Sequence, residues 1–293
     1  MRKKISLVWA LWLSLLILAI PAIGHHHAPE KPQKTGILLV AFGTTFPEAQ
    51  VSFEVIEKKT REAFPDTEIR WAFTSQVIRK ILAEEGQKLD SVAQALSRMA
   101  EEGFTHVAVQ SLHTIAGEEF HKLYQTVSAF RHIPGGIEKI LVGLPLMGEQ
   151  KDMARVESAI LATLPEQRRP EEAVIFMGHG SDHASNASYP ALMWRLQQQD
   201  PNIFVGVVKP FPEISDILPV LKERKIEKVW LLPFMAVAGD HARNDMAGPD
   251  EDSWKSILEN AGMECEVILR GTGEYTEFVD IWVDHIRETM EQF

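Results

Sequence analysis

The sequence VWLLPFMAVAGDHARNDMAG, residues 229–248, decides the fold, because it runs from a buried strand into a cluster of polar side chains. It opens as an apolar run, reaches Gly-Asp-His at residues 239–241, and continues into Arg-Asn-Asp at residues 243–245. In α/β proteins the chemistry lies at the carboxyl ends of the parallel strands. The stretch therefore predicts such a strand end, carrying an imidazole and carboxylates. A buried strand followed by an ordinary solvated loop is the alternative.

The same alternation of apolar runs and helical segments extends outward over the chain. Short apolar runs predict strands, and apolar residues at helical spacing between them predict helices. Strands that alternate with helices form parallel sheets with crossover connections, so the predicted fold class is α/β. The expected strands are residues 36–42, 68–73, 106–112, 137–144, 173–177, 203–208, 229–234 and 264–269, and a closing helix is expected at 276–290.

The two halves of the chain resemble each other. Residues 107–119 (VAVQSLHTIAGEE) align with residues 229–241, and the opening strands align at residues 42–44 and 177–179. An internal duplication of this kind predicts two related α/β lobes with a cleft between them. The expected division is an N-terminal α/β lobe at 36–165 and a C-terminal α/β lobe at 166–293, which carries the histidines.

Composition excludes several classes of protein. The chain has 293 residues and a formal net charge of -11, and an acidic protein is poorly suited to binding nucleic acid as its main partner. Cys265 is the single cysteine, so an intramolecular disulfide and a cysteine-based zinc or iron–sulfur site are excluded. Metal chemistry must therefore come from histidines and carboxylates.

The N-terminus has the pattern of an export signal. Three basic residues at 2–4 precede an apolar run at 5–20, and Ala22 and Gly24 then supply small residues at the -3 and -1 positions of a cleavage site. The run is shorter than the roughly twenty residues that span a membrane. We expect a signal peptide at 1–24, a disordered leader at 25–35, and an exported, periplasmic protein with no membrane contact after cleavage. An uncleaved anchor is the alternative.

Two histidines occupy matching positions in the duplicated pattern. His179 aligns with Thr44, and His241 aligns with Glu119, so both histidines follow strands of the same lobe. We expect the two strand ends to be neighbours, with Glu119 facing them from the other lobe. Such a cluster suits a divalent first-row metal, and the imidazoles could instead act as general bases. Ordinary hydrogen-bonded loop histidines are the alternative.

The other histidines are weaker candidates. His113 follows a strand of the first lobe and could face the same cleft or be structural, and His183 lies in the polar loop after His179. His121 lies on an expected helix, where an exposed surface role is the default. The remaining histidines of the folded part, His106, His132 and His285, are interpreted as structural.

Five motifs carry a family resemblance: AFGTT at 41–45, AFTS at 72–75, QSLH at 110–113, FMGHG at 176–180 and AGDHARNDMA at 238–247. Together, in this order, they resemble the sirohydrochlorin cobaltochelatases of the anaerobic cobalamin pathway. These are class II chelatases, related in fold to protoporphyrin ferrochelatase. The resemblance implies two Rossmann-like lobes, a tetrapyrrole bound in the cleft between them, and metal insertion without a nucleotide or another cofactor.

The resemblance also implies roles for individual residues. His179 and His241 would hold Co²⁺ or Fe²⁺ and help to accept the pyrrole protons. The family's motif Val-Glu-x-Tyr-Pro-Glu reads VKPFPE at 208–213, so Lys209 replaces the first glutamate and Glu213 keeps the second. A protonated ammonium cannot be a metal ligand. The expected metal ligands are His179, His241, Glu213 and Glu119, and the expected substrate-binding residues are Thr44, Thr74, Ser75, His113 and Arg243.

The export signal leaves alternatives open, since cobalamin assembly is cytoplasmic. The protein could be an exported carrier of haem, another tetrapyrrole or a metal on a chelatase scaffold, with His121 as an axial haem ligand. A two-lobed periplasmic metal-binding protein is a third alternative. The sequence does not separate Co²⁺ from Fe²⁺ or Ni²⁺. The sequence leaves the oligomeric state open between a monomer and a homo-oligomer, for which Trp254 and the aromatic C-terminal helix could supply an interface.

Overall fold

The computed structural model describes residues 32–293, and residues 33–293 form one compact unit. The predicted signal peptide at 1–24 and most of the predicted leader at 25–35 lie outside the described residues. The first strand begins at Thr35. Within the part of the chain that the structure describes, every helix is too short or too polar to cross a membrane.

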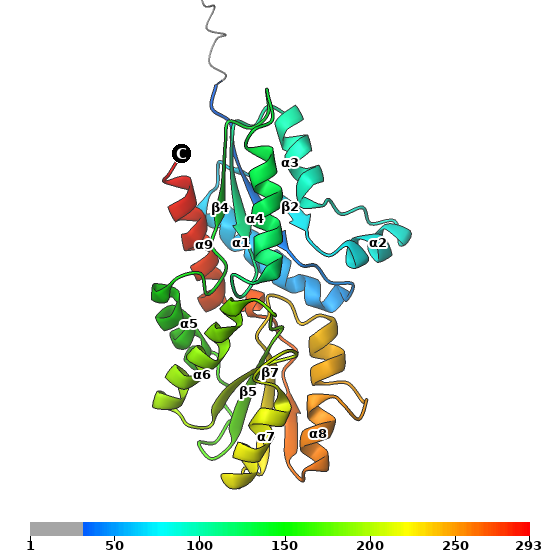
Figure 1. The fold of residues 1–293 in the computed structure, drawn as a ribbon, viewed down its shortest axis with the longest axis vertical. Coiled ribbons are helices and arrows are strands. Elements are labelled where there is room, and N and C mark those ends of the chain that lie inside the picture. The colour runs from blue at the N-terminus through cyan, green and yellow to red at the C-terminus, as the bar shows by residue number, and fades with distance from the viewer. Residues whose placement is uncertain (1–31) are drawn as a thin grey trace, which may run out of the picture. The chain divides into compact units, whose positions relative to one another are not determined.

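The first half forms a four-stranded parallel sheet in the order β2-β1-β3-β4 (Figure 1). Both faces of this sheet are covered. Ile37 and Leu39 of β1 belong to the core cluster that contains residues of α1 and α9, and Leu38 and Val40 belong to the cluster with α3 and α4. A strand that is buried on both faces reads as a continuous apolar run, and β1 has the sequence TGILLVA. The elements are β1 (Thr35–Ala41), α1 (Val51–Ala63), β2 (Glu68–Phe73), α2 (Gln76–Glu84), α3 (Val92–Glu101), β3 (His106–Ser111), α4 (Glu118–Phe130) and β4 (Lys139–Gly143).

The second half repeats this arrangement in the order β6-β5-β7-β8. Each strand therefore occupies the place that its counterpart has in the first sheet. The predicted α/β fold, with two parallel sheets related by duplication, is confirmed. The elements are α5 (Gln150–Ala162), β5 (Ala173–Gly178), α6 (Ser188–Gln199), β6 (Ile203–Val207), α7 (Ile214–Glu223), β7 (Lys228–Pro233), a π-helical turn (Ala242–Met246), α8 (Trp254–Asn260), β8 (Glu264–Val267) and α9 (Thr276–Met290), with short 3-10 turns at Pro47–Gln50, Ala184–Ala187 and Thr272–Glu274.

The last helix of the chain, α9, packs against the first sheet, although it follows the strands of the second. α9 packs against β3, β4 and α1 of the first lobe and against α5, as the red helix of Figure 1 shows. Its apolar face, which includes Phe278 and Trp282, is buried in the cluster that also contains Ile37 of β1 and Val174 of β5. One core cluster therefore extends through both halves. The predicted lobe boundary between residues 165 and 166 stays a prediction.

The prediction that Trp254 and the aromatic residues of the C-terminal helix could form an oligomer interface is wrong. Trp254 is 4 % exposed and Trp282 is 1 % exposed, because both rings are buried inside the lobes. Neither aromatic side chain is available to a second copy of the chain. The oligomeric state itself stays a prediction.

Candidate functional site

The structure brings His179 and His241 together. Their ring centroids lie 4.9 Å apart, with the ring planes at 70°. His179 directly follows Gly178, the last residue of β5, and His241 immediately precedes the π-helical turn that comes after β7. β5 and β7 are neighbours in the sheet, so the predicted convergence of the two strand ends is observed.

In both rings, Nδ1 is the nitrogen that contacts an oxygen atom of the protein. His179 Nδ1 lies 2.9 Å from the carbonyl oxygen of Gly180, and His241 Nδ1 lies 2.5 Å from a carboxylate oxygen of Asp245. Both partners are acceptors, so each Nδ1 carries the proton and donates it. In the neutral rings the lone pair is then on Nε2, the nitrogen that can bind a metal or accept a proton.

Close backbone packing holds His179. Gly180 has φ +81°, and a Cβ there would lie 1.7 Å from the carbonyl oxygen of Lys209. A Cβ at Gly178 would lie 2.5 Å from the ring of Tyr189, which is buried and whose pKa burial raises. The two glycines therefore allow the end of β5 to pass between the segment after β6 and the Tyr189 ring.

The first lobe contributes the segment after β1. The Phe42 ring centroid lies 6.4 Å from that of His179, and 43 % of this side chain is exposed. Thr44 is buried, and its hydroxyl oxygen accepts the backbone N–H of Phe46 at 3.1 Å. The predicted substrate residue Thr44 thus has a local hydrogen bond, while Phe42 presents an apolar surface beside the histidine pair.

His113 lies near the pair and is neutral. Burial lowers the pKa of His113 to about 4; the negative charge of Glu119 opposes this shift, and His179 adds to it. Its Nδ1 lies 2.9 Å from Ser111 Oγ, and its buried Nε2 has no hydrogen-bond partner among the described residues. His113 therefore adds a third, neutral imidazole, whose charge state responds to His179 and whose buried Nε2 has no partner among the described residues.

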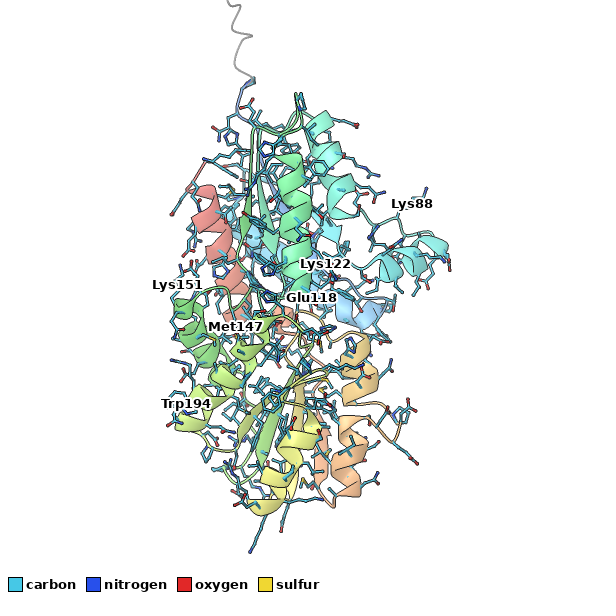
Figure 2. The ribbon with its side chains drawn as sticks, viewed as in Figure 1. Lys88, Glu118, Lys122, Met147, Lys151 and Trp194 are labelled. Carbon is cyan, nitrogen blue, oxygen red and sulfur yellow. The ribbon has the colours of Figure 1, made fainter. Side chains whose placement is uncertain are left out.

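The predicted carboxylate ligands do not join the histidines here. Glu119 pairs with Lys122 at 3.0 Å on α4, where Figure 2 labels the lysine. Glu213 lies at the start of α7, and its backbone N–H donates to Asp216 at 2.8 Å. Within residues 32–293 no three His, Cys, Asp or Glu side chains are grouped so that they could hold a metal ion. The four-ligand set of the sequence stays a prediction.

Lys209 stands where the resembling family has a glutamate. Its side chain is exposed, and its carbonyl oxygen packs against Gly180, next to His179. Lys209 makes no ion pair with any residue of the described range. The segment after β6 therefore presents an exposed cationic side chain.

The remaining predicted substrate residues are largely engaged in the fold. Arg243 donates from Nε to the Ala238 carbonyl at 3.1 Å, lies 4.9 Å from the Phe46 ring, and comes within 3.7 Å of Glu48. Ser75 caps α2, since its hydroxyl accepts the N–H of Ile78 at 3.3 Å. The buried hydroxyl oxygen of Thr74 is the exception, because it has no partner within the described residues.

A second histidine pair joins the two lobes. The rings of His121 on α4 and His183, in the loop after β5, lie 4.5 Å apart. His121 Nδ1 donates to the Gly117 carbonyl at 2.8 Å, whereas His183 Nδ1 accepts the N–H of Ser185 at 3.1 Å. The sequence did not reveal this pairing, and it gave Asp245 no role. The four-residue spacing between His241 and Asp245 was the pattern that could have indicated their contact.

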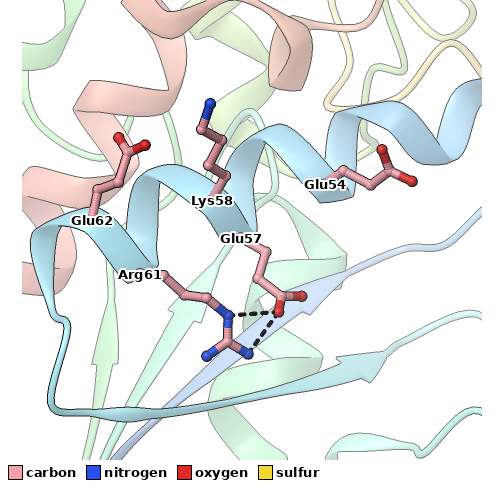
Figure 3. Close-up of a pocket in the computed structure, with 5 residues that line it drawn as sticks. All are labelled: Glu54, Glu57, Lys58, Arg61 and Glu62. Carbon is pink, nitrogen blue, oxygen red and sulfur yellow. Dashed lines mark hydrogen bonds and ion pairs between the residues drawn. The ribbon is translucent and has the colours of Figure 1, made fainter.

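A surface hollow lies elsewhere on the molecule, along α1 (Figure 3). Arg61 donates twice to Glu57 there, at 2.9 and 2.7 Å. The hollow contains none of the predicted site residues. Its lining consists of five charged side chains, Glu54, Glu57, Lys58, Arg61 and Glu62.

Comparisons of the sequence with a protein-family model and with known proteins agree on one family. The family described as cobalt chelatase (CbiK) matches residues 35–291. The sirohydrochlorin cobaltochelatase CbiKC of Nitratidesulfovibrio vulgaris is 45 % identical over 253 residues, which cover 86 % of this chain and 89 % of that protein. The sirohydrochlorin cobaltochelatase of Salmonella typhimurium is 34 % identical over 259 residues, which cover 88 % of this chain and 97 % of that protein.

Solved structures show the same fold at lower identity. SirB of Bacillus subtilis with Fe³⁺ aligns with a TM-score of 0.56 at 16 % identity, covering 88 % of this chain and 96 % of that one. CbiX, described as the terminal enzyme of sirohaem biosynthesis in denitrifying bacteria, aligns with a TM-score of 0.55 at 16 % identity, covering 86 % and 98 % of the two chains.

Proposed function

Because the chain belongs to the cobalt chelatase family, we propose that it inserts Co²⁺ into sirohydrochlorin, with His179 and His241 holding the metal. Two relatives named sirohydrochlorin cobaltochelatase, at 45 % and 34 % identity, support this substrate. The observation that carries the assignment of the site is the 4.9 Å approach of two imidazoles whose Nδ1 atoms both donate to oxygen.

The chemistry needs a base and a metal-binding group at the same place. Insertion breaks two pyrrole N–H bonds, and the nitrogen electron pairs that remain bind the incoming cation. A neutral imidazole Nε2 can hold Co²⁺ before transfer and can accept a pyrrole proton as the cation leaves. Phe42 provides an apolar surface beside the pair, and the exposed cation of Lys209 is suited to a carboxylate of the macrocycle.

The site assignment is tested with an anaerobic insertion assay on the full-length protein. We expect His179→Ala and His241→Ala each to lower the insertion rate by at least about 100-fold, since each removes a base and a ligand. His132→Ala is the matched control, because His132 is an exposed imidazole with no contact to the site. Unchanged rates in both site variants would refute the assignment.

We propose Co²⁺ as the preferred metal over Fe²⁺ and Ni²⁺. Neutral imidazole binds all three ions, so the preference must come from the number and type of the other ligands. The same assay with each ion in turn measures the preference. A higher kcat/KM for Fe²⁺ than for Co²⁺ would make the protein an iron chelatase.

We further propose that the protein works after export, in the periplasm. The basic residues at 2–4, the apolar run at 5–20 and the small residues Ala22 and Gly24 support this location. Residues 1–30 fused to a reporter enzyme that is active only outside the cytoplasm should give activity. A fusion without residues 1–24 should give none, and equal activity of the two fusions would contradict export.

A second candidate function is haem binding through His121. The carbonyl of Gly117 fixes the Nδ1–H tautomer of this ring and leaves Nε2 for an axial bond to iron. Haem added to the full-length protein should give an absorption band that His121→Ala abolishes and His132→Ala retains. Haem bound tightly by a protein that inserts no cobalt would favour the carrier over the chelatase.

A further inference from the structure

The two histidines of the site differ in what holds their Nδ1 atoms. A backbone carbonyl accepts the proton of His179, whereas the carboxylate of Asp245 accepts the proton of His241, at 2.5 Å. A hydrogen bond to an ionised acceptor is shorter and stronger than one to a neutral acceptor. The orientation of His241 is therefore set by a side chain that a single substitution can remove without changing the backbone.

The π-helical turn Ala242–Met246 brings Asp245 back to His241. Met246 and Ala242 are fully buried and anchor the turn in the second lobe, and Gly248 N–H donates to the Asn244 carbonyl at 2.9 Å. The same spacing recurs one residue earlier, where Asn244 Nδ2 donates to Asp240 at 2.8 Å. π-Helical turns are rare and are frequently found at functional sites. This turn presents two consecutive side-chain pairs, and only one of them contains a residue of the site.

Fold stability does not explain the His241–Asp245 pair. The side chains are 35 % and 46 % exposed, and a pair so open to water contributes little to the free energy of unfolding. The ring of His179 lies 4.9 Å from that of His241, centroid to centroid. The carboxylate of Asp245 thus acts on a ring that has a second imidazole of the proposed site beside it.

We propose that Asp245 is the positioning residue of the metal site. It keeps His241 in the Nδ1–H tautomer and holds the ring so that the Nε2 lone pair is available to the cation beside His179. Carboxylates behind ligating histidines have this effect in metal sites, where their removal weakens metal affinity by about 10–100-fold. The inference rests on the proposed function, because it assumes that His241 is a metal ligand.

The test measures Co²⁺ binding and Co²⁺ insertion separately on the full-length protein. Asp245→Ala should weaken the Kd for Co²⁺, measured by calorimetry, by about 10–100-fold. Asp245→Asn should lie between the alanine variant and the parent, because its amide oxygen still accepts from Nδ1–H but carries no charge. The absorption spectrum of bound Co²⁺ should change in the alanine variant, and in the insertion assay its KM for Co²⁺ should rise more than its kcat falls.

Asp240→Asn is the matched control, since it removes a carboxylate from the same turn that contacts Asn244 and not the imidazole. It should leave the Kd for Co²⁺ within about twofold of the parent, and the melting temperatures of all the variants should agree within about 2 °C. Parental affinity in Asp245→Ala, or an equal loss in Asp240→Asn, would overturn the positioning role. If the parent binds Co²⁺ but inserts none into sirohydrochlorin, the proposed function fails while the affinity series still decides the role of Asp245.

Discussion

Glu172 shows how a single residue couples the stability of the fold to pH. Its carboxylate lies just before β5 and accepts hydrogen bonds at 2.7 Å from Trp230 Nε1 of β7 and at 2.7 Å from Arg169 Nε. Burial alone would raise the pKa of Glu172, but the hydrogen bonds from Trp230 and Arg169 outweigh it and lower the pKa to about 2. The ionised carboxylate therefore links two neighbouring strands of the second sheet.

The first prediction follows from the sign of this shift. A carboxylate whose pKa is lower in the folded state stabilises the fold above its unfolded pKa, and the contribution disappears as the pH falls from about 4.5 towards 2. We expect Glu172→Gln to lower the free energy of unfolding by about 2 kcal/mol at pH 7, less than the full shift implies because solvent screens exposed Arg169. Urea unfolding of the parent and of Glu172→Gln, at pH 7 and at pH 3, measures this difference in the free energy of unfolding. A difference between parent and variant that is the same at both pH values would contradict the linkage.

For the candidate site, the sequence predicts the contacts that follow from the order of the strands and from the internal duplication. The approach of His179 to His241 was predictable because both residues follow strands whose pairing the duplication predicts. The contacts of Arg243 with Phe46 and Glu48 were not found, since they join residues that are far apart in sequence. The partner of His241 depends on the π-helical turn, a local geometry that residue type and periodicity do not specify.

At the scale of elements, a buried polar contact fixes α9 to the first lobe. His285 of α9 has both ring nitrogens facing oxygen atoms, with Nδ1 3.0 Å from the Leu144 carbonyl and Nε2 3.1 Å from Asp152 of α5. The side chains are 1 % and 0 % exposed. The same two helices also share a half-buried ion pair, Arg155–Asp284, at 2.5 Å. One helix pair thus offers a fully buried and a partly exposed contact for direct comparison.

The second prediction uses this comparison. Asp152→Ala should lower the free energy of unfolding by about 3 kcal/mol, because His285 is left in the interior without its partner. Arg155→Ala should lower the free energy of unfolding by only about 1 kcal/mol, since solvent reaches about a third of each side chain of its ion pair and screens it. Denaturant unfolding measures both, and a double-mutant cycle with His285→Ala isolates the coupling. Equal effects of Asp152→Ala and Arg155→Ala would refute a special role of the buried contact.

The types of the elements were predictable, whereas the destination of α9 was not. Apolar runs such as the one in β1 have a length and composition typical of buried strands, and the structure contains strands at all eight expected places. The apolar face of α9 shows that this helix is packed, but its periodicity does not say against which sheet. The sequence division at residue 165 placed α9 with the second lobe, and the helix packs against strands of the first.

At the scale of the whole molecule, the duplication and the returning helix together make one folding unit. The two sheets have the same topology, with the strand orders β2-β1-β3-β4 and β6-β5-β7-β8. The core cluster that contains Ile37 of β1 and Val174 of β5 also contains Trp282 of α9. A substitution in the buried face of α9 should therefore lower the stability of both lobes, because both contribute residues to this core.

The last prediction tests that coupling with two tryptophans. Trp282 of α9 is 1 % exposed, and Trp194 of α6, labelled at the surface in Figure 2, is 65 % exposed. Trp282→Ala should lower the free energy of unfolding by about 3–5 kcal/mol, and Trp194→Ala by less than about 0.5 kcal/mol. Hydrogen exchange with mass spectrometry follows peptides of β3 and β7 separately, and in Trp282→Ala both should lose protection at the same denaturant concentration. Loss confined to β3 would mean that the lobes unfold independently, and that the shared core does not couple them.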